Sequence, residues 1–120
     1  MRKALKAELQ RLKMTVIWSL EGWAAAWASE KTLRQWTLAN VLSIALALVL
    51  DLTSVERALI IGFGLMILVA ELLNTAIEET VNRISRVDHP LSKKAKDIGS
   101  AAVAVTALNA GVIWLIILIG

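Results

Sequence analysis

Long apolar stretches alternate with short polar segments over most of this chain. From residue 38 to residue 50 the only polar side chains are Asn40 and Ser43, and residues 98–120 carry no charge. A further uncharged stretch, residues 58–70, contains no proline and continues directly into a polar segment. A helix needs about 20 residues to cross a bilayer. The pattern therefore predicts three membrane-spanning helices, over about residues 32–52, 55–83 and 95–119.

The N-terminal residues show a different pattern, in which apolar side chains recur at steps of three and four. This stripe, opposite a face rich in lysine, arginine and glutamate, consists of Leu5, Leu9, Leu12, Val16, Leu20, Trp23 and Trp27. Basic residues opposite leucine and tryptophan are typical of a helix that lies in the membrane interface. The same periodicity also suits a helix packed in a soluble core. Because membrane spans follow, we expect an amphipathic surface helix over about residues 3–28.

Two short polar segments separate the predicted spans. The first begins at Asp51 and offers Ser54 as an N-cap for the second span. The second, residues 85–92, holds the only proline and the only histidine, and Ser92 is the N-cap that we expect there. The sequence thus predicts one all-α membrane domain over residues 1–120.

Composition and charge support this interpretation. The chain has 120 residues, is 58% hydrophobic and has a mean hydropathy of +0.67, which is too apolar for an ordinary soluble domain. Of its thirteen lysines and arginines, only Arg57 lies between the first two spans. By the positive-inside rule, the N-terminus is cytoplasmic and the C-terminus lies on the far side. Because the cations follow the membrane boundary, we expect no nucleic-acid partner. The absence of cysteine excludes disulfides and thiolate metal sites.

Polar side chains share one face of the second span. At about 100° per residue, Glu71, Asn74, Glu78 and Asn82 fall close together. Placing them beside apolar residues is costly, so we expect chemistry or cation binding rather than a simple helix–helix contact. Carboxylates suit Mg²⁺, which often keeps waters and phosphate oxygens as further ligands. One carboxylate could hold the metal while the other acts as a general base.

Two further groups are candidates on the same side of the membrane. Glu30 precedes the first span and could complete a metal site with Glu78, or be a solvated charge at a helix end. The segment Lys96-Asp97-Ile-Gly99-Ser100 begins the third span. Its lysine could hold the phosphates of an anionic ligand, or be an ordinary cytoplasmic flank.

Several kinds of function remain open at this point. The chain has no P-loop, no glycine-rich kinase loop, no dinucleotide fingerprint and no serine–histidine–aspartate order. An enzyme acting on a membrane substrate explains all three polar groups. A small oligomeric ion or proton carrier could use Glu71 and Glu78 as a relay, but it leaves Glu30 and Lys96 unexplained. A purely structural membrane protein is the third possibility.

The motif Glu71-x-x-Asn74-Thr75-Ala-Ile-Glu78 resembles the signature of the small prokaryotic diacylglycerol kinases. Two more segments resemble that family in the same order, namely Ala25-Ala-Trp27-x-x-Glu30-x-x-x-Arg34-Gln35 and Ala95-Lys96-Asp97-x-Gly99-Ser100-Ala-Ala-Val. The resemblance implies a homotrimeric lipid kinase of the bacterial inner membrane, with three transmembrane helices and a surface helix per subunit. It would transfer the γ-phosphoryl group of MgATP to diacylglycerol, giving phosphatidic acid, at sites between subunits. Undecaprenol kinases belong to the same family and are the alternative.

The resemblance also implies residue roles. Glu71 would be the general base and Asn74 would orient the site, while Glu30 and Glu78 would hold Mg²⁺. The residues expected around the nucleotide are Arg11, Trp18, Glu30, Glu78, Asp88, His89, Lys96 and Asp97. Those expected near the lipid are Arg11, Glu71 and Ser100. The chain departs from the family at Asn82, where aspartate is usual, at Trp36 in place of an acid, and at Trp18 in place of a tyrosine.

Overall fold

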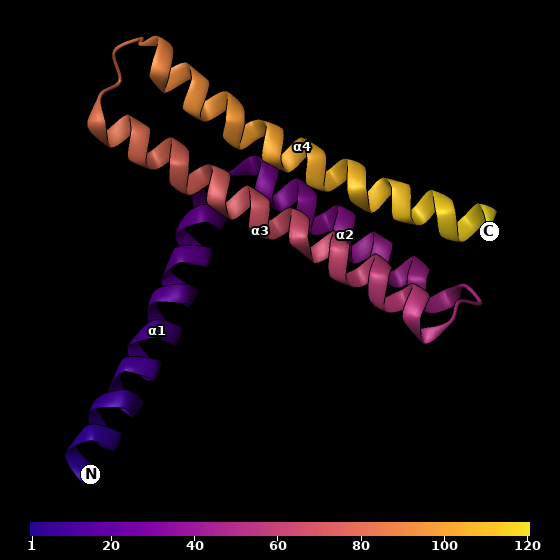
Figure 1. Ribbon diagram of the computed structural model, residues 1–120, viewed down its shortest axis with the longest axis horizontal. Coiled ribbons are helices and arrows are strands. Elements are labelled where there is room, and N and C mark those ends of the chain that lie inside the picture. The colour runs from indigo at the N-terminus through magenta and orange to yellow at the C-terminus, as the bar shows by residue number, and fades with distance from the viewer.

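The computed structural model describes all 120 residues as four α-helices without any strand (Figure 1). The helices are α1 (Arg2–Ser29), α2 (Lys31–Val49), α3 (Ser54–Ile84) and α4 (Pro90–Ile119). By length and composition, α2, α3 and α4 can each cross a membrane, and α1 is not among the candidate spans. The predicted all-α fold, with three potential spans and an N-terminal helix, is confirmed.

Helix α3 is the centre of the molecule. Helices α2 and α4 each pack against α3 and make no close backbone contact with each other. Helix α1 leaves this bundle at a wide angle, and its N-terminus lies far from the other helices (Figure 1). Its buried residue, Ala26, lies in its last turn. The bundle therefore meets α1 only at the end that joins α2.

Most of the buried apolar residues belong to α2 and α3. Leu33 and Ala47 of α2 are fully buried, and Ile60 and Ile67 of α3 are nearly so. Most other large apolar side chains along the spans are exposed in the single chain. Exposed apolar helix faces of this length are stable only against lipid or another protein surface. The fold is thus built for a membrane environment.

The start of α3 is fixed by a capping box. The Thr53 hydroxyl accepts a hydrogen bond from the Glu56 backbone N–H at 3.2 Å, and the Glu56 carboxylate accepts from the Thr53 N–H at 2.8 Å. Thr53 is therefore the N-cap, and the prediction of Ser54 was wrong by one residue. A capping box needs a glutamate or glutamine three residues after the cap, and Thr53 has Glu56 at that position whereas Ser54 has Arg57.

The start of α4 also differs from expectation. His89 is the N-cap, because its Nδ1 accepts a hydrogen bond of 3.0 Å from the Leu91 N–H. Pro90 follows at the first helical position, where its fixed φ and missing N–H suit a helix start. The prediction of Ser92 as the cap was therefore wrong. Helix α4 begins before the residues expected to cross the membrane.

Arg57 closes the turn between α2 and α3. Its Nε donates to the Ala47 carbonyl at 2.9 Å and a terminal nitrogen donates to the Leu50 carbonyl at 2.9 Å. The last carbonyls of a helix lack partners within the helix, and a cation is favoured at that end. The one cation between the first two spans is thus a helix cap.

Glu30 is the single residue that separates α1 from α2. Its backbone is extended, with φ −112° and ψ 103°, although no glycine or proline lies nearby. The Arg34 guanidinium donates to the Trp27 carbonyl across this corner. The bond ties the first turn of α2 to the last turn of α1. The corner sets the direction in which α1 leaves the bundle.

Candidate active site

Helix α3 presents a buried polar face. Glu71, Asn74 and Thr75 are only 4%, 8% and 7% exposed, and the Asn74 amide donates to the Glu78 carboxylate at 3.3 Å. Two buried oxygens on this face, Asn74 Oδ1 and Thr75 Oγ1, have no hydrogen-bond partner. Unpaired buried polar atoms are rare in folded proteins because each one costs free energy. This face is therefore suited to a polar ligand.

The corner at Glu30 brings a further carboxylate to this face. Thr32, Glu30 and Glu78 all lie close enough to Glu71 to act on its carboxyl group. Burial raises the pKa of Glu30 above its ordinary value, the charges of Glu78 and Glu79 raise it further, and Arg34 opposes them. Three glutamates from two segments thus converge. Like charges held together in this way favour binding of a cation or a proton.

These side chains can hold a divalent metal only together with ligands from another molecule. No three acidic or histidine side chains are positioned to hold one ion together. Glu30, at the corner between α1 and α2, and Glu78, on α3, can offer two carboxylates. Magnesium is commonly held by one or two carboxylates while waters and substrate phosphates complete its octahedron. The geometry suits a metal that arrives with phosphate groups.

A second polar region surrounds the loop between α3 and α4. A hollow of about 660 Å³ is lined by Ser85, Arg86, Val87, Asp88, His89, Pro90, Ser92, Lys93 and Lys96. The Lys96 ammonium donates to the Asn82 amide oxygen at 2.8 Å, which ties α4 to the last turns of α3. The structure therefore brings Asp88, His89 and Lys96 together. The mixture of cations and hydrogen-bonding groups suits a phosphorylated ligand.

A groove of about 710 Å³ runs between α1 and α3. It is mainly apolar, with small residues on the α1 side and hydroxyl or acidic groups along it: Ser19, Gly22, Trp23, Ala25, Ala26, Ser29, Leu72, Thr75, Ala76 and Glu79. It passes the unpaired Thr75 hydroxyl, one helical turn from Glu71. A mainly apolar groove with a few polar groups suits an amphiphilic molecule.

Comparisons with known proteins show which family this chain resembles. A family model described as prokaryotic diacylglycerol kinase matches residues 17–118. A diacylglycerol kinase of Pseudomonas aeruginosa is 47% identical over 112 residues, covering 93% of this chain and 91% of the relative. A diacylglycerol kinase of Escherichia coli K12 is 40% identical over 101 residues, covering 84% and 83%. One from Haemophilus influenzae is 36% identical over 97 residues, covering 81% and 82%.

The chain belongs to the prokaryotic diacylglycerol kinase family. This confirms the resemblance found in the sequence. Together with its three apolar helices, membership of the family makes the chain a bacterial membrane protein. The matched region includes both the acidic face of α3 and the loop hollow, and it begins within α1.

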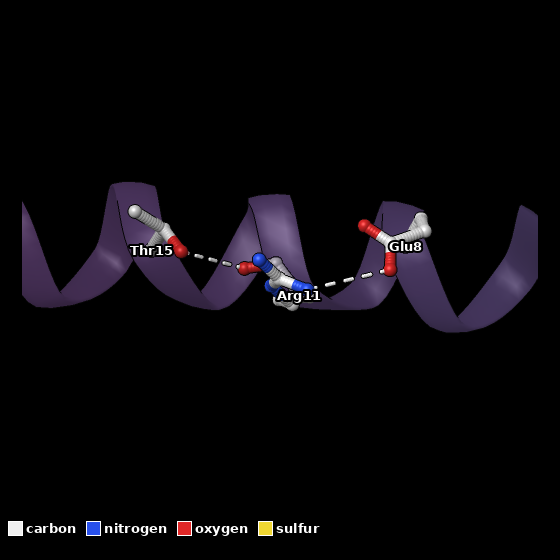
Figure 2. A network of polar contacts seen from close by, with 3 residues as sticks. All are labelled: Glu8, Arg11 and Thr15. Carbon is white, nitrogen blue, oxygen red and sulfur yellow. Dashed lines mark hydrogen bonds and ion pairs between the residues drawn. The ribbon is translucent and has the colours of Figure 1, made fainter.

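Two residues that the family resemblance assigns to the nucleotide lie apart from this face. Arg11 is on the exposed part of α1, where a terminal nitrogen pairs with Glu8 at 3.4 Å and its carbonyl accepts from Thr15 at 2.9 Å (Figure 2). It precedes Glu30 by 19 residues, about 28 Å along a helix. Trp18 is 59% exposed on the same helix. A single chain therefore does not bring Arg11 or Trp18 to its own acidic face.

Asp97 and Ser100 also lie outside the loop hollow. Asp97 pairs with Lys93 at 2.6 Å on the exposed side of α4, and it does not line the hollow that contains Lys96. Ser100 is exposed, one turn beyond Lys96. Consecutive residues of a helix point about 100° apart, so Lys96 and Asp97 face different directions.

The contribution of three residues to the acidic face could not be recognised from the sequence. Thr32 faces Glu71 from α2, and it had no signal beyond being a polar residue near a helix start. Thr75 is buried beside Asn74. The helical spacing of Glu71, Asn74, Glu78 and Asn82 does not by itself predict that Thr75 is buried. Gly99 lets α4 approach α3: a Cβ there would collide with Asn74 Oδ1 and lie 3.5 Å from Ile77 Cδ1. Its packing role was predictable, but its partner was not.

Proposed function

We propose that this protein transfers the γ-phosphoryl group of MgATP to the hydroxyl of diacylglycerol, giving phosphatidic acid and ADP. The main observation in support of this function is that the buried Glu71 lies near Glu78 and Glu30. These residues are at the end of the bundle that also holds the loop hollow. Family membership supports a kinase, and the relatives named above are diacylglycerol kinases. The groove between α1 and α3 supports an amphiphilic substrate.

Glu71 is the proposed general base. As the lipid hydroxyl oxygen bonds to the γ-phosphorus, the bond from that phosphorus to the β,γ-bridging oxygen breaks and ADP leaves. The hydroxyl proton passes to the Glu71 carboxylate. Burial at 4% exposure keeps bulk water from this carboxylate, so the lipid hydroxyl rather than water is the acceptor. Asn74, one turn away, orients the site by donating a hydrogen bond from its amide to the Glu78 carboxylate.

The remaining side chains hold the phosphates. Bound at Glu30 and Glu78, Mg²⁺ would neutralise charge on the triphosphate. Lys96 contacts phosphate oxygens, and Asp88 and His89 border the nucleotide, since all three line one hollow. Phosphoryl transfer depends mainly on positioning and charge neutralisation, which these groups supply without a separate nucleotide domain.

The proposed enzyme is a homotrimer. Arg11 precedes Glu30 by 19 residues on α1 and Trp18 is exposed on the same helix, so in an oligomer these residues of α1 can serve a neighbouring subunit. The distribution of cations supports a bacterial inner-membrane location, with the N-terminus cytoplasmic and the C-terminus periplasmic. Helix α1 then lies in the cytoplasmic interface and the polar faces meet cytoplasmic MgATP.

A two-lipid kinase assay tests this function. The purified protein, in detergent or bilayers, is offered diacylglycerol and undecaprenol with labelled MgATP. Labelled phosphatidic acid without labelled undecaprenyl phosphate supports the proposal. The reverse result identifies an undecaprenol kinase and overturns the choice of lipid. Labelling of neither lipid overturns the kinase function and leaves the ion-carrier alternative.

A further inference from the structure

Lys96 is held by a neutral partner. Its ammonium donates at 2.8 Å to the Asn82 amide oxygen, across 14 residues of sequence from α4 to α3, and both residues are only partly exposed. The two ion pairs in the structure are Arg11 with Glu8 and Lys93 with Asp97. Lys96 is therefore fixed in direction without being neutralised.

The comparison with Lys93 shows why this matters. Both lysines line the loop hollow, but the Lys93 ammonium is bound at 2.6 Å to a carboxylate that offsets its charge. An ammonium has three N–H donors, and Asn82 uses one of those on Lys96. The other two donors and the full positive charge are available to a ligand in the hollow.

We propose that Asn82 is a positioning residue, whose amide oxygen holds the Lys96 ammonium at the loop hollow with its charge free for the phosphate oxygens of the nucleotide. A free lysine side chain loses much conformational entropy when it binds a ligand, and a lysine already held by Asn82 loses less. The inference rests on the proposed function, because that function places nucleotide phosphates at Lys96.

The test is a double-mutant cycle on the full-length enzyme in detergent. Asn82→Ala removes the acceptor and is expected to raise KM for MgATP about tenfold, with little change in kcat, as for loss of one hydrogen bond to a charged group. Lys96→Met raises KM at least as much. In the Lys96→Met background, Asn82→Ala has no further effect. A change below twofold on Asn82→Ala, or full additivity with Lys96→Met, overturns the proposal.

The aspartate variant tests the neutral character of the partner. Asn82→Asp keeps an acceptor for Lys96 and is expected to hold KM within about threefold of wild type. Unlike the asparagine, the aspartate forms an ion pair with Lys96 and offsets its charge. Affinity for MgATP should then fall less steeply with salt than in the wild type, because less net charge is screened. Equal salt dependence in the two proteins overturns the claim that the Lys96 charge is free.

Two further measurements separate the possible failures. Thr80→Val is the matched control, since the Thr80 hydroxyl bonds only to the Ala76 carbonyl of its own helix, and it should leave KM unchanged. Thermal unfolding in detergent identifies any variant that fails to fold, and Asn82→Ser, which is too short to reach Lys96, then replaces Asn82→Ala in the cycle. Binding of a fluorescent ATP analogue gives the same cycle without turnover. Coupling in binding without lipid phosphorylation overturns the proposed function and retains the role of Asn82.

Discussion

The Trp114 indole Nε1 in α4 donates a hydrogen bond of 2.9 Å to the Ser43 hydroxyl in α2. These residues are 71 positions apart, and their helices make no close backbone contact. Each helix packs on α3, so this bond joins the two outer helices of the bundle. Between them lies a crevice of about 180 Å³ that includes both residues and Gly64.

Trp114→Phe should therefore weaken the bundle. The ring keeps most of its apolar contacts but loses its donor, and hydrogen bonds between membrane helices average about 0.6 kcal/mol. A loss of that size should appear as a lower midpoint of thermal unfolding in detergent. Ser43→Ala should lower it similarly, and the double variant should be no less stable than Trp114→Phe alone. Additive losses would show that the bond contributes nothing.

Glu71→Gln should abolish turnover and preserve nucleotide binding. The amide keeps the shape of the side chain but cannot accept the hydroxyl proton, and a general base contributes about 10²- to 10⁴-fold. We expect kcat for lipid phosphorylation to fall by that factor, with the affinity for MgATP within about threefold of wild type. A variant that keeps wild-type kcat would remove Glu71 from the mechanism. Glu21→Gln, at an exposed position of α1, is the control.

Gly99→Ala should damage the acidic face through packing. A Cβ at this position would collide with Asn74 Oδ1, and displacing that amide breaks its contact with Glu78. Overpacking of this kind costs about 1–3 kcal/mol. We expect lower stability and a fall in kcat of about tenfold or more, since one misplaced group can cost up to 100-fold. Gly111→Ala, in the same helix with nothing within 4 Å of its Cβ, should retain activity and stability.

The metal-free protein should lose stability as pH rises through the pKa of Glu30. That pKa is raised by burial, then by Glu78 and Glu79, with Arg34 opposing, so the folded protein binds more protons than the unfolded chain between the ordinary and the raised values. The free energy of unfolding therefore falls with increasing pH across that window. Melting temperatures measured in EDTA should show this slope, and Glu30→Gln should flatten it.

Added Mg²⁺ should offset this loss of stability at the upper end of the pH window. A cation that binds the ionised carboxylates stabilises the folded protein and lowers the pKa of Glu30. Stability at the upper end of the window should thus rise with added Mg²⁺ in the wild type and less in Glu30→Gln. An unchanged pH slope in Glu30→Gln would assign the slope to other groups.

Local patterns predicted the helices but not all of their ends. Ser54 and Ser92 are good N-cap residues, yet Thr53 and His89 hold those positions because Glu56 and Pro90 follow them at the required spacing. The polar face of α3 was predictable from the helical period. The position of Asp97, beside Lys93 and away from the loop hollow, was not, because it depends on which face of α4 packs against α3.

The sequence by itself determined three apolar helices, the amphipathic helix before them and the row of polar residues from Glu71 to Asn82. These follow from the length of uninterrupted apolar runs and from the 3.6-residue period, which are local properties. Only the tertiary structure decided that Glu30 turns toward Glu78, that Lys96 is bound by Asn82 and that Trp114 reaches Ser43. Such pairs depend on the rotation and depth at which helices pack, and those are set by side chains far apart in the chain.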